Sequence, residues 1–160
     1  MAGFKKGIKS GTYIPINPDK WIITETFDNK KGEPGIKYRS SWEHKFMRFC
    51  DYNDNILKVN SEGMVIPYVS PVDGKTHKYY MDFMVETKAG ISLVEVKPFH
   101  ETQPPKPPRS NAKNPQKAAL NYQKAIQTFA VNQAKWEATR ILCEKNGWSF
   151  KIITERELGL

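Results

Sequence analysis

The 160-residue sequence predicts one α/β domain in which helices flank a mixed central sheet. Three observations lead to this fold class. Helical spacing of apolar residues runs from residue 40 to 51, β-branched and aromatic runs occupy 56 to 97, and a helical composition over 116–146 precedes a last strand at 148–154. The predicted order is therefore helix, about three sheet strands, helix, strand. The length suits one domain, and 39% hydrophobic residues suffice for one core.

Residues 1–37 are predicted to form an extended basic N-terminal arm, and the folded domain is predicted to span 38–157. The arm segment holds eight glycines and prolines and seven lysines, and it shows no sustained period of two or 3.6 residues. The apolar stretches at 14–16 and 21–23 are expected to lie across the domain. The lysines are expected to face a phosphate backbone.

The first predicted helix has Ser40 as its N-cap and an apolar face spaced i, i+4, i+7, i+8, formed by Trp42, Phe46, Phe49 and Cys50. Two short strands are predicted after it, at 56–59 and 64–69, with polar turns at 60–63 and 71–74. A hairpin with strands at 79–85 and 91–97 follows.

The second predicted helix, 116–146, carries two apolar faces and ends before Gly147. One face holds alanines at 130, 134 and 138 with Ile141, and the other holds Tyr122, Phe129 and Trp136. Two explanations stay open: the helix is broken near Ala130, or it is sandwiched with the alanines against the sheet and the aromatics under the arm. The preceding loop, 98–115, contains six of the eleven prolines together with Lys106, Arg109 and Lys113.

The charge balance indicates a polyanionic partner, with nucleic acid as the first expectation. Lysine and arginine number 25 against 17 acidic residues, which gives a formal net charge of +8. No apolar run reaches the length of a membrane span or a signal peptide, so an intracellular protein is expected. Cys50 and Cys143 are predicted to be buried thiols in a reducing compartment, and no zinc or Gly-rich nucleotide motif is found.

Four charged residues stand where an apolar residue would cost less: Glu43, Asp82, Glu95 and Lys97. Residues two apart on a strand share a face, and directly paired residues of a hairpin do so as well. If Thr87 pairs with Gly90, Asp82 stands opposite Glu95 on the face that also carries Lys97. A shift by one residue would turn Asp82 to the other face. The chemistry therefore predicts the hairpin register.

Two neighbouring carboxylates repel each other unless a cation lies between them, and oxygen ligands favour Mg²⁺ or Mn²⁺. Asp82 and Glu95 are the predicted ligands, with the main-chain carbonyl of Val96 as a further one. Glu43 is expected to complete the metal shell directly or through water, and the alternative that it only caps the helix with Ser40 stays open. Lys97 is expected to orient or deprotonate a water molecule.

This pattern of Asp82, twelve residues, Glu95-Val96-Lys97 and an earlier helix with Glu43 resembles the PD-(D/E)xK nuclease superfamily. Met81 stands where the superfamily's name has proline. The resemblance implies a restriction-endonuclease-like core of the order α-β-β-β-α-β. More narrowly, the chain from about residue 38 to 157 resembles the T4-type phage head completion nucleases, relatives of the TnsA-like transposon endonucleases, in four stretches: 38–43, 66–74, 94–98 and 132–137.

The resemblance implies a metal-dependent deoxyribonuclease that trims packaged DNA before the tail joins the head. Implied partners are DNA and phage capsid, portal or neck proteins, and the implied locations are the host cytoplasm during assembly and the virion. Phosphate contacts are expected from Lys106, Arg109, Lys113, Lys135 and Asn132. Two alternatives stay open, a structural head-completion or DNA-end-binding protein without cleavage and a transposase-associated or repair endonuclease. Endonuclease and exonuclease action are not distinguished.

Binding to DNA is expected to weaken steeply with salt and to be insensitive to base sequence, because the predicted contacts reach backbone phosphates. Fluorescence anisotropy with duplexes of unrelated sequence, repeated over a range of salt concentrations, measures both properties. Salt-independent binding would contradict the polyanion interpretation.

Overall fold

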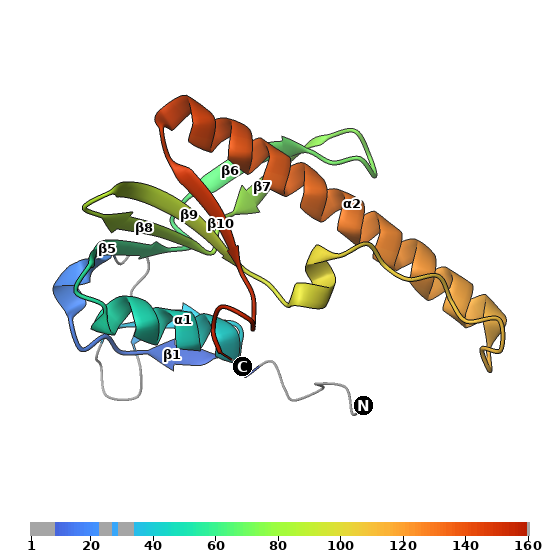
Figure 1. Cartoon of the computed structure of the whole chain (residues 1–160), viewed down its shortest axis with the longest axis horizontal. Helices are drawn as coiled ribbons and strands as arrows, with labels where there is room; N and C mark the ends of the chain where they lie inside the picture. The colour runs from blue at the N-terminus through green and yellow to red at the C-terminus, as the bar shows by residue number, and fades with distance from the viewer. Residues whose placement is uncertain (1–8, 23–26, 29–33, 160) are drawn as a thin grey trace.

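The computed structural model describes residues 9–22, 27–28 and 34–159. Its centre is a five-stranded mixed sheet in the order β10-β9-β8-β5-β2 (Figure 1). The outer pairs β10–β9 and β2–β5 are parallel, and the inner pairs β9–β8 and β8–β5 are antiparallel. The strands are β2 (Trp21–Ile22), β5 (Ile56–Ser61), β8 (Phe83–Thr87), β9 (Gly90–Val96) and β10 (Ser149–Ile153).

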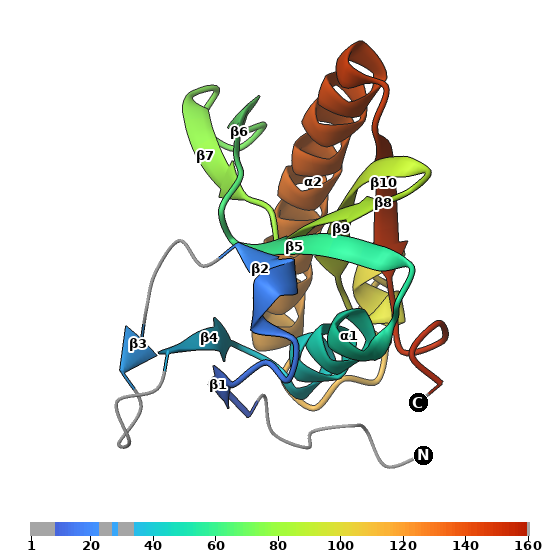
Figure 2. The same cartoon turned by 90° about the vertical axis from the view of Figure 1, so that its left-hand side faces the viewer.

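Two helices, α1 (Ser41–Tyr52) and α2 (Pro115–Asn146), lie on opposite sides of this sheet (Figures 1 and 2). Each side has its own cluster of buried apolar residues, one beneath α1 and one between α2 and the sheet. The α/β class with a mixed sheet flanked by helices is therefore confirmed. Among the described residues, neither helix has the apolar length that crossing a bilayer would require.

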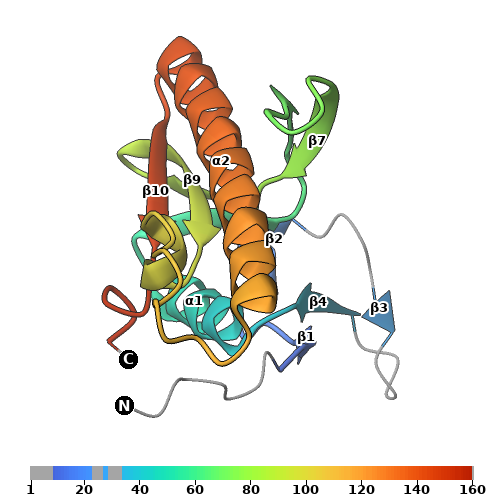
Figure 3. The ribbon, with the colours of Figure 1, turned by 90° about the vertical axis from the view of Figure 1, so that its right-hand side faces the viewer.

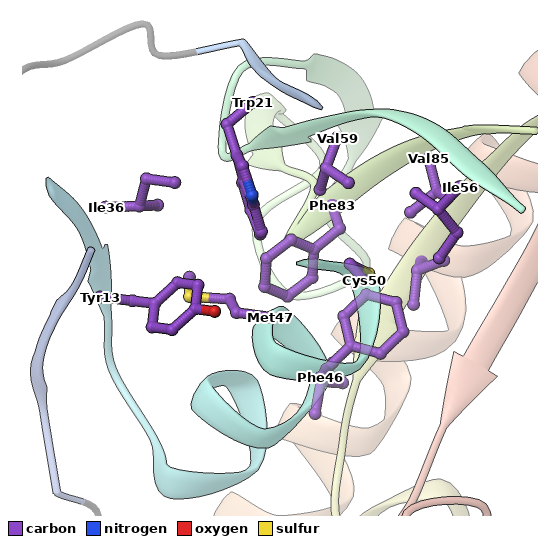
Figure 4. Packing of buried hydrophobic residues seen from close by; sticks show 12 residues of the cluster. Tyr13, Trp21, Ile36, Phe46, Met47, Cys50, Ile56, Val59, Phe83 and Val85 are labelled. Atoms are coloured by element: carbon purple, nitrogen blue, oxygen red, sulfur yellow. The ribbon is translucent and has the colours of Figure 1, made fainter. Parts of the chain in front are cut away.

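Helix α1 packs its apolar face on the sheet as its spacing predicts. Ser40 is the N-cap, and its hydroxyl accepts the backbone N–H of Glu43 at 3.1 Å. Phe46, Met47 and Cys50 are buried (Figure 4), and the Phe46 ring lies 4.9 Å from that of Phe83 on β8. Phe49, which was expected on the buried face, is 54% exposed.

The hairpin formed by β8 and β9 has the register that the chemistry predicts. Thr87 pairs with Gly90 and Phe83 with Val94, so that position 82 falls opposite position 95. Phe83 and Val94 belong to the cluster beneath α1, whereas Leu93 belongs to the cluster on the α2 side. Because successive side chains alternate across a strand, the residues at 82 and 95 belong to the α2 side.

The predicted strand 79–85 is divided between two sheets. Strands β6 (Val65–Val69) and β7 (Thr76–Tyr80) form a separate antiparallel pair, and the chain passes from β7 to β8 at Met81 and Asp82. There the Met81 N–H bonds the carbonyl of Met64, and the Asp82 carbonyl accepts the N–H of Glu62. The sequence pattern is continuous across this step because both sheets bury alternate residues, such as Tyr79, Met81 and Phe83.

The described part of the N-terminal segment differs from the predicted extended arm. It contains β1 (Gly11–Tyr13), a 3₁₀ turn at Pro18–Lys20, β2, and part of a small sheet in the order β1-β4-β3, with β3 (Phe27–Asp28) and β4 (Pro34–Tyr38). Tyr13, Trp21 and Ile36 are buried in the cluster beneath α1 (Figure 4). Residues 1–8, 23–26 and 29–33 of the predicted arm lie outside the described residues.

The buried carboxylate of Asp51, in the last turn of α1, attaches this N-terminal segment. It accepts hydrogen bonds from the Tyr13 hydroxyl at 2.5 Å, from the N–H groups of Ile16 and Asn17 at 2.7 and 3.1 Å, and from the Trp21 indole at 3.2 Å. Burial raises the pKa of Asp51, but these donors outweigh burial and leave the pKa below its ordinary value.

Helix α2 is unbroken over its whole length, so the predicted break near Ala130 is wrong. Its end is set by Gly147, which adopts the left-handed conformation with φ of 69°. Ala134 and Ala138 pack against the buried cluster, as the sandwich alternative predicts, and Trp136 is fully buried in the same half of the helix. Figure 3 shows this half of α2 running alongside β9 and β10.

The loop before α2 starts with a 3₁₀ turn at Phe99–Thr102 that the C-terminal segment holds in place. Glu155 accepts the N–H of Phe99 at 2.8 Å, and the Arg156 guanidinium lies 3.3 Å from the centre of the Phe99 ring. Both predicted buried thiols, Cys50 and Cys143, are free and buried, and burial raises the pKa of Cys50 to about 12.

Replacing Asp51 by asparagine is expected to lower the free energy of unfolding at pH 7 by about 2–4 kcal/mol, because buried donors lose a charged acceptor. The pKa of Asp51 is lower in the folded state than in the unfolded state. Its stabilisation is therefore present above the unfolded pKa and is lost as the pH falls through the folded pKa. Urea titrations between pH 7 and pH 3 should show a flatter acid dependence for D51N than for the unmodified chain, and parallel curves would contradict this role.

Candidate active site

Asp82 and Glu95 lie next to each other where β8 begins and β9 ends. The pairing of Phe83 with Val94 places them opposite one another, and Asp82 Oδ2 accepts the backbone N–H of Val96 at 2.8 Å. Glu95 is only 5% exposed, and its Oε2 accepts a hydrogen bond from the Tyr79 hydroxyl. Two acidic side chains are thus fixed at one end of the sheet.

The electrostatics of this pair are unfavourable. Burial raises the pKa of Asp82 well above its ordinary value, and the charge of Glu95 raises it further, as does the more distant Glu43. The N–H of Val96 and the ammonium of Lys97 act in the opposite direction without offsetting the increase. Burial and the neighbouring carboxylate therefore make the ionised form of Asp82 unfavourable.

Lys97 lies at the end of β9, two residues beyond Glu95 and on the same face. Its Nζ is 3.5 Å from Glu95 Oε1 and 3.8 Å from a carboxylate oxygen of Glu101 in the following 3₁₀ turn. Its backbone N–H bonds the carbonyl of Ile153, which extends the pairing of β9 with β10 to this residue. The ammonium is half-buried beside the carboxylate pair.

Glu43 takes part in helix capping and also acts on the carboxylate pair. Its Oε2 accepts the backbone N–H of Arg39 at 2.8 Å, which takes the place of the Ser40 N–H of a standard capping box. Burial raises the pKa of Glu43, and the charge of Glu62 adds to this. The negative charge of Glu43 also raises the pKa of Asp82, although Glu43 is not among the residues that line the pocket beside the pair. The capping contacts of Glu43 are thus observed, and its contribution to a metal shell stays a prediction.

Lys135 reaches the site from α2, which lies on the other side of the sheet from the helix that bears Glu43. Its Nζ lies 5.3 Å from the ring centre of Tyr79 and 5.7 Å from that of Tyr68. Burial lowers the pKa of Lys135, the charge of Lys97 lowers it further, and the charges of Glu95 and Asp82 partly restore it. Lys135 and Lys97 therefore flank the same carboxylates from two elements.

The carboxylates open into a pocket of about 480 Å³. Five cationic side chains and three acidic ones line it: Lys37, Arg39, Lys78, Lys97 and Lys135 with Glu62, Asp82 and Glu95. At its rim Arg39 forms a bidentate ion pair with Glu62, at 3.0 and 3.3 Å. The pocket thus has carboxylates at its floor and cationic side chains at its rim. This arrangement suits a bound anion with a metal cation between the anion and the carboxylates.

Sequence reasoning did not find Arg39, Lys78 or Tyr79 as parts of this site. Arg39 directly precedes the N-cap of the helix that bears Glu43, so its position could have been inferred from Glu43. Tyr79 and Lys78 belong to β7, which had been merged with β8, and that merger concealed the change of sheet that brings Tyr79 to Glu95.

The residues predicted to contact phosphate are divided between two places. Lys135 lines the pocket, and Asn132, one turn earlier on α2, is buried. Lys106, Arg109 and Lys113 do not line the pocket and are exposed on the loop before α2.

Within the described residues, no group of three His, Cys, Asp or Glu side chains is arranged as ligands of one metal ion. The donor set still suits a divalent cation, because Asp82 and Glu95 present carboxylate oxygens side by side, where burial and then the charge of Glu95 raise the pKa of Asp82. A site with two protein carboxylates and remaining positions for water and phosphate is typical of Mg²⁺.

Comparison with known proteins adds two findings. Residues 53–155 match the family described as TnsA-like endonuclease N terminal. The chain is also 37% identical over 155 residues to the head completion nuclease of Enterobacteria phage T4, covering 94% of this chain and 95% of that protein. The matched region includes Asp82, Glu95, Lys97 and Lys135.

Replacing Asp82 by asparagine is expected to raise the free energy of unfolding at pH 7 by about 0.5–2 kcal/mol, since it removes a repelled charge and keeps an acceptor for the Val96 N–H. The raised pKa means that the ionised carboxylate opposes folding above its unfolded pKa. Urea denaturation in the presence of EDTA measures the change, with E86Q on exposed β8 as the matched control. A loss of stability in D82N would show that Asp82 is a structural carboxylate.

Proposed function

The chain belongs to the TnsA-like endonuclease family, and on that premise we propose that it is a metal-dependent nuclease that hydrolyses DNA phosphodiester bonds during phage head completion. The observation that carries the proposal is the grouping of Asp82, Glu95 and Lys97 at the floor of a cation-rimmed pocket. A purely structural protein has no need of repelled carboxylates at a sheet end, because they oppose folding.

Asp82 and Glu95 would hold Mg²⁺ or Mn²⁺, with the main-chain carbonyl of Val96 and, directly or through water, Glu43. When bound, the ion supplies charge stabilisation at the phosphate and a bound water of lowered pKa. Tyr79 is a positioning residue, because its hydroxyl fixes one oxygen of Glu95 and leaves the other toward Lys97.

Lys97 is proposed to act on the attacking water and on the phosphate. The water oxygen bonds to phosphorus and releases a proton to solvent, the bond from phosphorus to the leaving strand's oxygen breaks, and that oxygen takes up a proton from solvent. The ammonium of Lys97, beside Glu95, is placed to orient the water and to stabilise the negative charge of the transition state. Lys135 adds a second positive charge from α2.

The biological setting is proposed from the name of the T4 relative, which is a head completion nuclease. The 37% identity covers nearly all of both chains, which supports a shared role. We therefore propose that the reaction acts on packaged phage DNA before the head joins the tail. It would take place in the host cytoplasm during assembly, with capsid, portal or neck proteins as partners, and the protein would be retained in the virion.

Cleavage of supercoiled and linear DNA with Mg²⁺ or Mn²⁺ tests this function. D82N, E95Q and K97M are each expected to lower the cleavage rate by about 10²–10³-fold or more, because each removes charge or ligand at the reacting phosphate. E43Q should cost less, about 10–100-fold, because Glu43 is not among the residues that line the pocket.

Matched controls are E86Q and K88Q, which remove the same charges on exposed residues of the same hairpin. Circular dichroism verifies that each variant is folded. Loss in the site variants with unchanged controls supports the proposal. A folded, DNA-binding wild type that cuts with neither metal would overturn it in favour of a structural or DNA-end-binding role.

A further inference from the structure

Half of α2 has no packing partner in the body of the molecule. Residues 103–130, which are the loop before α2 and the first half of the helix, extend beyond the sheet, and the loop runs along the helix (Figure 1). We name this segment the α2 projection. The structure describes all of it, and none of its residues is buried, whereas the second half of α2 buries Asn132, Trp136, Thr139 and Cys143.

The α2 projection lies within a stretch that lacks acidic residues. Between Glu101 and Glu137 the sequence has six lysines and arginines and no aspartate or glutamate, although the chain's average would give about four acids in such a length. None of the five cations on the projection forms an ion pair with any described residue; they are Lys106, Arg109, Lys113, Lys117 and Lys124. Their charge is therefore not neutralised by the protein.

The helical lysines are aligned with the active site. Lys117 and Lys124 are seven residues apart, and Lys124 and Lys135 are eleven residues apart. At about 100° of rotation per residue, these separations differ from two and three whole helical turns by only about 20° each. They consequently share one stripe of α2, together with Asn121 and Thr128. At its inner end this stripe places Lys135 in the catalytic pocket, and along the projection it is exposed.

The loop leaves this stripe uncovered. The half-buried residues in the first half of α2 repeat every three to four positions along a neighbouring stripe: Ala118, Tyr122, Ala125 and Phe129. The loop's own half-buried residues include Pro105 and Ala112. A proline-rich loop that packs on this apolar stripe explains why both the helix residues and the loop residues are half-buried. It adds Lys106, Arg109 and Lys113 beside the lysines of the helix.

We propose that the α2 projection is a DNA-backbone track that holds the duplex beside the cleaved bond. From Lys135 to Lys117 the helix rises about 27 Å, the length of about eight base pairs at 3.4 Å each. Cations on a rigid scaffold that carry no base-reading pattern bind phosphates without sequence preference. The position of the cleaved bond rests on the proposed nuclease function, whereas binding by the projection does not.

The test compares two triple variants with the same loss of charge. K113Q/K117Q/K124Q removes cations from the projection, and K88Q/K145Q/K151Q removes exposed lysines from the hairpin turn, the end of α2 and β10. Anisotropy with a 24-base-pair duplex in EDTA measures affinity without cleavage. We expect the projection variant to lose about tenfold or more at 0.1 M salt and to flatten the slope of log K against log salt by about 2–3. The control variant should change affinity by less than about threefold.

With Mg²⁺ or Mn²⁺, the projection variant should raise KM on the same duplex and leave kcat unchanged, because its residues do not touch the reacting phosphate. Equal losses of affinity in the two triple variants would overturn the track, even if the wild type cuts. A selective loss in the projection variant supports the track, even if the wild type fails to cut and the proposed nuclease activity is abandoned.

Discussion

The pairing of β8 with β9 in a single register determines the chemistry of this chain. It puts Asp82 opposite Glu95, and the Val96 N–H holds Asp82 at that place despite the repulsion between the two carboxylates. Backbone hydrogen bonds and the apolar cluster beneath α1, where Phe83 and Val94 are buried, stabilise the register. The sheet thus offsets the loss of stability that the repelled carboxylates cause. A bound cation would neutralise the charge that remains on them.

Asp51 and Asp82 show how environment separates structural from chemical roles. Asp51 has four hydrogen-bond donors, which keep its pKa below the ordinary value and let it attach the N-terminal segment to α1. Asp82 accepts one backbone hydrogen bond, from the Val96 N–H, and has two acidic neighbours, so that burial and these charges leave its pKa raised. The different donors and the opposite pKa shifts of Asp51 and Asp82 cannot be read from residue type, because both residues are aspartates in or beside regular elements of similar hydrophobicity.

Much of the fold could be predicted because it depends on local patterns. The spacing of α1, the Ser40 cap and the Gly147 terminus follow from short-range rules. The hairpin register was predicted from the chemistry, because only one register sets Asp82 opposite Glu95. The break between Tyr80 and Phe83 could not be predicted, since both sheets bury alternate residues and the alternation runs on without interruption. The strands near the N-terminus were missed because they are short and depend on distant partners such as Asp51 and β5.

The carboxylates and Lys97 of the site could be found from their positions within apolar strands, and Lys135 was predicted as a phosphate contact on the second helix. Tyr79 could not be found in this way, because it reaches the site only through tertiary packing. The central claim is that Asp82 and Glu95 together form a divalent cation site. Calorimetric titration of Mn²⁺ into the unmodified chain, D82N, E95Q and E86Q tests it most directly. The account predicts saturable binding that D82N and E95Q abolish and E86Q retains. Equal binding by D82N and the unmodified chain would contradict it.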